Sequence, residues 1–189
     1  MRILELLKHS WICRSLAIAF DPTKASLSEP ELVLLRELVA ESEGIEGPII
    51  EIGTLIGRTT TELALANRSS RKIVTVDNYC WNPWALPPEI HYQTAAAILR
   101  FPVSRNLVEQ VHQDKSAFYQ SYNRSRPSLV FLDAMHDYEG TKEDILWAQS
   151  VDAEIISGHD YCDEFPGVIQ AVDEFGGPKR LAGSVWTLS

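Results

Sequence analysis

Short apolar segments alternate with helical segments from about residue 30 to the end of the chain, and this alternation most constrains the fold. Residues 47–53, GPIIEIG, and 72–77, KIVTVD, are typical of short buried strands. A helical pattern, RTTTELALAN, lies between them at 58–67. Strands that alternate with helices form crossover units in a largely parallel sheet. The sequence therefore predicts an α/β fold with a doubly wound, Rossmann-like sheet.

The other expected elements continue this order. A Ser before a Glu-Pro start and a Gly stop bound the first helix, at 27–44. Further strands are expected at 106–114, 128–133 and 153–160, with two short strands within 179–189. Further helices are expected at 91–101, 139–150 and 166–177. The strands are short apolar runs, which indicates that helices cover both faces of the sheet.

Residues 1–28 are expected to form a helical extension, and residues 29–189 the main domain. The first twenty residues, MRILELLKHSWICRSLAIAF, are largely apolar, but Glu5, Lys8 and Arg14 interrupt them. No run approaches the ~18 apolar residues of a membrane span, so the segment predicts a short amphipathic helix. Three roles are open to this helix: closing the core, capping a pocket, or meeting a second subunit in a homodimer.

The net charge and the cysteine content of the chain indicate which kinds of ligand and which cellular compartment to expect. The chain has 189 residues, a formal net charge of -9 and a pI of about 5.0. A nucleic-acid-binding protein needs a basic face to meet phosphates, so this balance favours a small molecule or a metal. Cys13, Cys80 and Cys162 are far apart and form no C-x-x-C pair. We therefore expect a reduced, cytoplasmic protein that binds neither nucleic acid nor membrane.

Titratable residues stand at the end of each of the first five expected strands. In a doubly wound sheet, ligands bind beyond the carboxyl ends of the strands. These positions hold Glu51, Asp77, Asp114, Asp133 and the pair His159-Asp160. Asp is also a common turn residue, but like charges gathered at one edge repel unless a ligand or cation meets them. The pattern predicts a binding site at this edge of the sheet.

The first strand enters its helix through EIGTLIGRTT, a Glu-x-Gly-x-x-x-Gly sequence. Gly53 would let a ligand approach the backbone closely, and Gly57 would open the tight turn into the helix. The spacing matches neither a dinucleotide-binding Gly-x-Gly-x-x-Gly nor a P-loop, which disfavours a pyrophosphate site. Asp77, at the end of the next strand, can accept both ribose hydroxyls of an adenosine, or can simply cap the following turn.

Five segments together resemble class I S-adenosylmethionine-dependent methyltransferases. They are EIGTLIGRTT, VTVDNY, QDKS, LVFLDAMHDYEGTKEDI and IISGHDYCDEFPGVIQAVDEF. The closer likeness is to a small subfamily, methyltransferase family 24. Its fourth strand ends in an Asp-x-x-His-x-Tyr-like pattern and its fifth in Gly-His-Asp. The resemblance covers roughly residues 30 to 188 and implies a mostly parallel seven-stranded sheet with an antiparallel last strand.

The resemblance also implies which residues hold S-adenosylmethionine across the ends of the first three strands. Those at its methionine and ribose are Glu51, Gly53 and Gly57, and Thr54 and Thr59 are further cofactor-binding residues. Those at the ribose hydroxyls and the adenine are Asp77, Asn78, Asp114 and Ser116. Asp133 would lie next to the methionyl part and the reacting methyl group.

Methyl transfer to a hydroxyl requires a positioned nucleophile and a way of removing its proton. A histidine can act as the base, and a divalent cation can lower the pKa of the acceptor oxygen. His136 and His159 flank Asp133 and Asp160, which end adjacent strands. Asp133, His136 and His159 are therefore candidate catalytic residues. Asp133 and Asp160 are candidate ligands of Mg²⁺ or another divalent metal.

Other residues near these strand ends have plainer interpretations. The acids Asp137, Glu139, Glu143 and Asp144 are expected at a helix start, where carboxylates favour the helix dipole. Trp147 is expected in the core, whereas Tyr138 and Tyr161 could line the acceptor pocket or merely pack. The segment CWNPWALPPEIHYQT, at 80–94, suits either a stiff aromatic lid over a substrate or a buried loop on the sheet.

The sequence thus predicts an S-adenosylmethionine-dependent methyltransferase. Its acceptor is expected to be a small polar molecule with a sugar or natural-product hydroxyl, methylated on oxygen with or without a metal. Two alternatives remain open. One is a metal-dependent enzyme of another reaction type, such as a hydroxylase-like activity, on the same scaffold. The other is a non-catalytic cofactor-binding domain.

Overall fold

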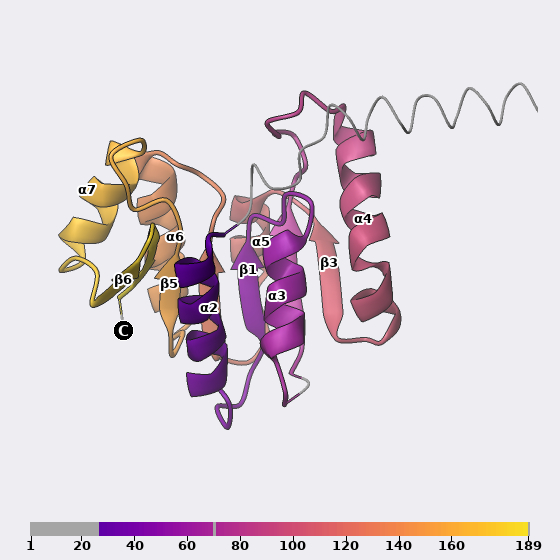
Figure 1. Cartoon of the computed structure of the whole chain (residues 1–189), viewed down its shortest axis with the longest axis horizontal. Coiled ribbons are helices and arrows are strands. Elements are labelled where there is room, and N and C mark those ends of the chain that lie inside the picture. The colour runs from indigo at the N-terminus through magenta and orange to yellow at the C-terminus, as the bar shows by residue number, and fades with distance from the viewer. Residues whose placement is uncertain (1–26, 70, 189) are drawn as a thin grey trace, which may run out of the picture.

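The structure is a computed structural model that describes residues 27–69 and 71–188 (Figure 1). These residues form one seven-stranded sheet with six helices. The strands are β1 (Ile49–Ile52), β2 (Ile73–Asp77), β3 (Val108–His112), β4 (Leu129–Leu132), β5 (Ile156–Gly158), β6 (Arg180–Ala182) and β7 (Val185–Thr187). The helices are α2 (Glu29–Glu41), α3 (Arg58–Ala66), α4 (Pro88–Ser104), α5 (Lys115–Ser121), α6 (Tyr138–Ser150) and α7 (Pro166–Glu174). Residues 1–26 of the expected N-terminal extension lie outside the described residues.

The strand order among these residues is β3-β2-β1-β4-β5-β7-β6. β1 lies between β2 and β4 and is parallel to both, with Ile49 opposite Ile73 on one side and Leu129 on the other. β7 runs antiparallel to β5 and to β6. The expected doubly wound sheet with an antiparallel last strand is therefore confirmed. The winding reverses between β1 and β4, which is where such sheets open a crevice.

Helices cover both faces of the sheet, as Figure 1 shows. Leu35, Leu63 and Leu99, from α2, α3 and α4, pack on one face, and Phe118 and Ile145, from α5 and α6, pack on the other. The strands supply alternate residues to the two cores, because successive side chains of a strand point to opposite faces. None of the helices in the described ranges has the length and hydropathy that crossing a bilayer would require.

Two helices differ from the sequence expectation. α4 starts at Pro88 and runs to Ser104, beyond the expected 91–101, because proline is tolerated in a first turn whose N–H groups lack helical partners. α5 was not expected. Asp114 is its N-cap, and the Asp114 carboxylate accepts a hydrogen bond from the Ser116 N–H at 3.0 Å. An Asp directly before a helix-compatible run was the available signal.

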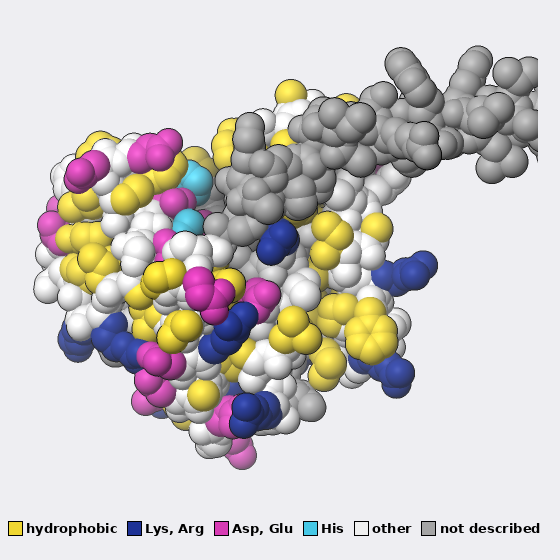
Figure 2. Space-filling view, viewed as in Figure 1, with side chains coloured by type: hydrophobic (Ala, Val, Ile, Leu, Met, Phe, Trp, Pro, Cys, Tyr) yellow, Lys and Arg dark blue, Asp and Glu magenta, His cyan; other side chains and the backbone are white. Residues whose placement is uncertain are grey.

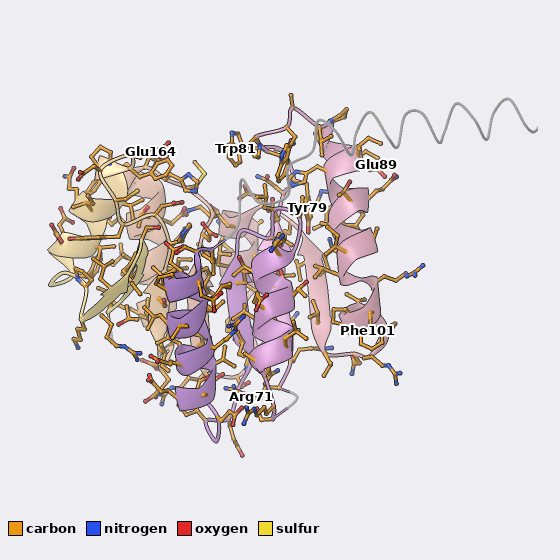
Figure 3. The ribbon with its side chains drawn as sticks, in the orientation of Figure 1. Arg71, Tyr79, Trp81, Glu89, Phe101 and Glu164 are labelled. Carbon is orange, nitrogen blue, oxygen red and sulfur yellow. The ribbon has the colours of Figure 1, made fainter. Side chains whose placement is uncertain are left out.

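The amino ends of the central strands are closed by Arg71, which lies at the end of the molecule away from Trp81 in Figure 3. Its guanidinium donates to the Ser42 carbonyl at 2.6 Å, to Ser128 Oγ at 2.9 Å and to the Val39 carbonyl at 3.2 Å. These bonds join the end of α2 to the segment before β4. Arg71 thereby fastens the edge of the sheet opposite the predicted binding site.

β1 and β4 approach each other closely where they leave the sheet. Gly53 has a φ of +101°, and a Cβ there would lie 2.0 Å from the Asp133 carbonyl oxygen. The Asp133 N–H donates to the Ile52 carbonyl at 2.8 Å, which extends the ladder past the strand ends. Gly53 is therefore required first by the neighbouring protein backbone. The sequence explanation, which invoked only an approaching ligand, was incomplete.

We predict that Gly53→Ala destabilises the fold by at least about 2 kcal/mol, because it adds a backbone clash to an unfavourable φ. Urea unfolding of both proteins measures the difference. Gly44→Ala is the matched control, since Gly44 also has a positive φ, +88°, but a Cβ added there would have nothing within 4 Å. Equal losses for the two variants would contradict the claim that contact with Asp133 matters.

Candidate active site

A pocket of about 700 Å³ opens at the carboxyl ends of the central strands. Figure 2 shows histidine side chains (cyan) beside acidic ones (magenta) near this end of the molecule. Trp81 and Glu164 both line the pocket, and Figure 3 shows them at the upper end of the molecule, in separate segments. The wall includes Gly53, Thr59, Asp77, Asn78, Trp81, Asp114, Lys115, Asp133, Met135, His136, His159, Asp160 and Phe165. The expected edge of the sheet is thus hollowed, and most of the strand-end residues reach it.

Asp77 holds the loop between β1 and α3. Its Oδ2 accepts from the Thr54 N–H at 3.0 Å and from the Leu55 N–H at 2.8 Å, and its Oδ1 accepts from the Tyr79 N–H at 2.7 Å. A carboxylate offers about four lone-pair positions, so about one remains for a ligand. Both sequence interpretations of Asp77 therefore describe part of its environment, because it organises turns and also faces the pocket.

Glu51 does not reach the pocket wall that the described residues form. Its side chain is fully buried under α3, where it accepts from Thr60 Oγ1 and Thr75 Oγ1, both at 2.5 Å. Burial raises the pKa of Glu51 to about 8, against the hydrogen bonds from the two threonines. The sequence expectation placed Glu51 at a strand end in contact with the cofactor, but it lies within β1, whose next residue, Ile52, is the last of the strand.

The other expected cofactor residues divide into two groups. Gly53, Thr59, Asp77, Asn78 and Asp114 line the pocket, whereas Thr54, Gly57 and Ser116 are absent from the wall built by the described residues. Thr54 Oγ1 bonds Thr75 Oγ1 at 2.6 Å, and Ser116 Oγ donates to Glu143 at 2.9 Å. Gly57 is the N-cap of α3 with a φ of +82°, as expected of a tight turn into a helix. These three residues support the wall from behind.

Asp133, His159 and Asp160 meet on the other side of the pocket. One potential ligand atom from each lies within 4.8 Å of the others. His159 Nδ1 is 3.5 Å from Asp133 Oδ1 and 3.3 Å from Asp160 Oδ1. Ligands bound at ~2.0–2.6 Å from a hard divalent cation lie within ~5 Å of one another, so the spacing fits such an ion, and the two carboxylates are donors of the type it prefers. The tertiary structure thus brings His159 beside the two carboxylates that were expected as ligands.

Backbone hydrogen bonds hold this cluster in position. The His159 N–H donates to the Leu132 carbonyl at 3.0 Å, which continues the β4–β5 pairing, and the His159 carbonyl accepts from Trp186 Nε1 at 2.9 Å. Asp160 follows in a left-handed conformation with a φ of +62°. Such a conformation is uncommon for a residue other than glycine and is frequent at functional sites.

The electrostatics of the cluster favour positive charge at its centre. Burial alone would lower the pKa of His159, but contacts with Asp133, Asp160 and Glu31 raise it to about 12. Burial also opposes ionisation of Asp160, yet His136 and His159 hold its pKa well below the usual range. Burial raises the pKa of Asp133, and His159 opposes that shift. The carboxylates therefore demand a cation, either the proton on His159 or a metal ion.

His136 approaches the same carboxylates from the loop after β4. Its Nε2 lies 3.0 Å from Asp160 Oδ2 and 4.0 Å from Asp133 Oδ1. The hydrogen bond with Asp160 raises its pKa, although burial opposes this. The ring packs edge-on against Phe165, with centroids 4.5 Å apart, and lies 6.2 Å from the Trp81 ring. His136 thus lies between the acidic cluster and the aromatic side chains Trp81 and Phe165, which line the pocket.

The sequence did not predict the ion pair beside the pocket between half-buried Lys115 and buried Asp144. Lys115 lines the pocket and pairs with Asp144, which also accepts from Tyr119 OH at 2.7 Å. Asp144 lies in the second turn of α6 on its buried side, so its expected place among helix-start acids was wrong. Asp137, by contrast, is the N-cap of α6 and accepts from the Gly140 N–H at 2.8 Å.

The aromatic segment after β2 divides between pocket and core. Trp81 is 64% exposed and lines the pocket with Pro83, whereas Tyr79 is fully buried. His91 is also buried, and its Nδ1 lies 3.1 Å from the Tyr79 carbonyl oxygen. Trp147 is in the core as expected, stacked on Tyr119.

Tyr138 and Tyr161 bond acids of α7, not pocket groups. Tyr138 OH donates to Glu174 at 2.8 Å and Tyr161 OH donates to Asp173 at 2.9 Å. Neither is in the wall that the described residues form. Of the two interpretations that the sequence left open for these tyrosines, packing is the one that the geometry supports.

The sequence did not predict Glu31. It lies in the first turn of α2, at the N3 position of a capping box, and its Oε1 is 3.4 Å from His159 Nε2. The pattern Ser28-x-x-Glu31 predicts a capping box, but nothing local in it indicates contact with a residue of β5. Only the packing of α2 across the sheet brings the two together.

Comparisons with known proteins agree with this architecture. A family model described as a methyltransferase domain matches residues 50–161. No curated protein sequence matches the chain. An O-methyltransferase from Bacillus cereus, solved with S-adenosylhomocysteine, is similar with a TM-score of 0.65 and 17% identity, over 96% of this chain and 87% of that one.

Two further solved structures share the fold. TomG from Streptomyces achromogenes, an O-methyltransferase involved in tomaymycin synthesis and solved with S-adenosylmethionine, has a TM-score of 0.62 at 17% identity, over 91% of this chain and 86% of its own. CalS11, a TDP-rhamnose 3'-O-methyltransferase of calicheamicin biosynthesis, has a TM-score of 0.61 at 17% identity, over 82% and 77%. At these identities the likeness is one of fold.

The buried Glu51 yields a pH-dependent prediction. In the folded chain it keeps its proton up to about pH 8, and in the unfolded chain only up to its ordinary value of 4.5. Its contribution to stability is therefore complete below pH 4.5 and is lost as the pH rises through 8, at about 1.4 kcal/mol per pH unit. We expect Glu51→Gln to remove this slope. The melting temperature of the variant, relative to that of wild type, should therefore increase between pH 5 and pH 8. Parallel curves would contradict a protonated Glu51.

Proposed function

The chain belongs to the methyltransferase-domain family of S-adenosylmethionine-dependent enzymes, and from that premise we propose that it methylates an oxygen of a small polar acceptor. The acceptor is a sugar or natural-product hydroxyl. One observation carries this proposal: an acid and histidine cluster, Asp133, His159 and Asp160, shares a single pocket with the loop that Asp77 organises. The names of TomG and CalS11, whose roles lie in natural-product pathways, support the acceptor class.

S-adenosylmethionine is proposed to bind across the ends of β1, β2 and β3. The expected cofactor residues that line the pocket are Gly53, Thr59, Asp77, Asn78, Asp114 and Asp133. Asp77 uses its remaining lone pair for the ribose. Asn78 Nδ2 lies 3.5 Å from Asp114 Oδ2, so these two residues form one polar edge suited to the adenine. Glu51, Thr54, Gly57 and Ser116 act on the cofactor only through the groups they hold in place.

The reaction is a displacement at the methyl carbon. The bond from the sulfonium sulfur to the methyl carbon breaks as the acceptor oxygen forms its bond to that carbon, and the acceptor proton passes to a base. The products are S-adenosylhomocysteine and a methyl ether. Because the sulfur leaves with its electron pair, the residues need only align the two molecules and remove one proton.

His136 is the proposed proton acceptor. When its Nε2–H donates to Asp160, the lone pair of the neutral ring is on Nδ1, where a proton can be taken up. Asp160 orients the ring and stabilises the imidazolium that forms. The other candidate catalytic residues are Asp133, whose Oδ1 lies 4.0 Å from His136 Nε2, and His159, which faces the other oxygen of the Asp160 carboxylate. Asp133 and His159 are proposed to hold the hydroxyl group of the acceptor in place.

Asp133 and Asp160, with His159, are the residues that would hold Mg²⁺ or another divalent cation. When bound, such a cation lowers the pKa of a hydroxyl in contact with it. The donor set of two carboxylates and one imidazole suits Mg²⁺ through its oxygens and Mn²⁺ through all three groups. Trp81 and Phe165 then offer apolar surface for the remainder of the acceptor.

Cofactor binding is tested by calorimetric titration of S-adenosylhomocysteine into the protein. We expect saturable binding, weakened at least about tenfold in Asp77→Asn, because the amide removes an acceptor from both the loop and the ribose. Asp137→Asn is the control, since it makes the same change in a helix cap outside the pocket wall. Binding that Asp77→Asn leaves unchanged would overturn the assignment of Asp77.

Metal binding is tested by titrating Mn²⁺ and measuring the free ion by electron paramagnetic resonance. Asp160→Asn is expected to weaken binding at least about tenfold, because it removes a ligand charge from the site. Asp163→Asn, an exposed neighbour outside the pocket wall, is the control and should bind as wild type does. Equal affinities for wild type and Asp160→Asn would refute the metal site and leave the cofactor assignment standing.

A further inference from the structure

Glu31 touches the proposed metal site from outside. Its carboxylate is nearly inaccessible to solvent and lies against the His159 ring on the side away from Asp133 and Asp160. Glu31 Oε1 is 3.4 Å from His159 Nε2, whereas Asp160 Oδ1 is 3.3 Å from His159 Nδ1. The two ring nitrogens therefore face different carboxylates, one on each side.

The Glu31 carboxylate is itself held by four donors. Oε2 accepts from the Ser28 N–H at 2.6 Å and from Ser28 Oγ at 2.7 Å. Oε1 accepts from the Ser184 N–H at 2.7 Å and from Ser184 Oγ at 2.8 Å. Ser28 precedes α2, and Ser184 lies in the turn between β6 and β7. The carboxylate is thus fixed in position by two elements far apart in the sequence.

The β6–β7 turn is shaped to admit this carboxylate. Gly183 has a φ of +59°, and a Cβ there would lie 2.5 Å from Glu31 Oε1. The Ser184 carbonyl accepts from the Tyr161 N–H at 3.0 Å, directly after Asp160. The same turn therefore contacts Glu31 and the chain segment that presents Asp160. A capping box alone needs only Ser28 and Glu31, so these further contacts are unexplained by helix capping.

We infer that Glu31 is a positioning residue that fixes the His159 ring, so that Nε2 carries the proton and Nδ1 is presented to the metal between Asp133 and Asp160. Histidine ligands commonly donate their second ring N–H to a carboxylate, and that bond determines which nitrogen binds the metal. Here the carboxylate comes from the first turn of α2. This inference rests on the proposed metal site.

The test compares Glu31→Gln with Ser28→Ala in the full-length protein, using Mn²⁺ as the probe and paramagnetic resonance as the readout. Both changes weaken the N-terminal cap of α2. In Glu31→Gln, either orientation of the amide places its NH₂ group against one of the backbone N–H groups that Glu31 now accepts from, those of Ser28 and Ser184. Only Glu31→Gln alters the group at His159 Nε2. We expect Mn²⁺ affinity to fall about 10- to 100-fold in Glu31→Gln and to stay near wild type in Ser28→Ala. Thermal melting of both variants measures their loss of stability.

A second measurement needs no variant. In wild type labelled with ¹⁵N-histidine and loaded with one equivalent of Zn²⁺, nitrogen shifts report which ring nitrogen carries the proton. For His159 we expect a protonated Nε2 and a metal-bound Nδ1. The opposite tautomer would overturn the inference even if Glu31→Gln did not fold.

The outcomes separate this inference from the proposal beneath it. Wild-type affinity for Mn²⁺ in a folded Glu31→Gln variant, or equal losses in Glu31→Gln and Ser28→Ala, would overturn the role of Glu31 and leave the metal site intact. If wild type and Asp160→Asn bind Mn²⁺ equally weakly, the metal site is refuted and the role of Glu31 with it. A loss confined to Glu31→Gln and Asp160→Asn supports both.

Discussion

The contact between β1 and β4 at their carboxyl ends sets the geometry of the pocket. Gly53 lies against the Asp133 carbonyl so tightly that no side chain fits, and the Asp133 N–H completes the ladder on Ile52. Two chain segments leave the sheet from this point in different directions. One forms the loop that Asp77 organises, and the other carries Asp133 towards His159. The proposed cofactor side and the proposed acceptor side of the pocket are therefore both anchored at the contact between Gly53 and Asp133.

Charge balance is the second constraint on the site. Asp133, Asp160 and Glu31 surround His159, and so much negative charge in a partly buried place requires a compensating cation. His159 can meet the requirement as an imidazolium, or can give up one proton when a metal takes that place. The metal ion that we propose would replace this proton at a site whose backbone is held by the strand pairing and by the bond from Trp186.

Sequence reasoning located the residues whose positions depend on the local order of strands along the chain. Asp77, Asp114, Asp133, His159 and Asp160 were expected at one edge because parallel strands bring their carboxyl ends together, and all five line the pocket. The expected strand at 47–53 already contained Glu51, but only the folded chain shows that its side chain points under α3 and away from the pocket wall that the described residues form. The helix α5 was not predicted, because Asp114 was interpreted only as a ligand of the cofactor. In the structure Asp114 is the N-cap of α5.

The class of fold, the order of the elements along the chain and the identity of the residues that follow each strand could all be read from the amino acids alone. The spacing of apolar residues and the types of residue that follow each strand are local properties, so they can be recognised without a structure. Which charged groups meet is a different matter, and it required the folded chain. Glu31 contacts His159 and Ser184, and Lys115 pairs with Asp144, across helices and turns that are distant in the chain. Such pairs depend on how α2, α5 and α6 pack over the sheet, and packing is a property of the whole core.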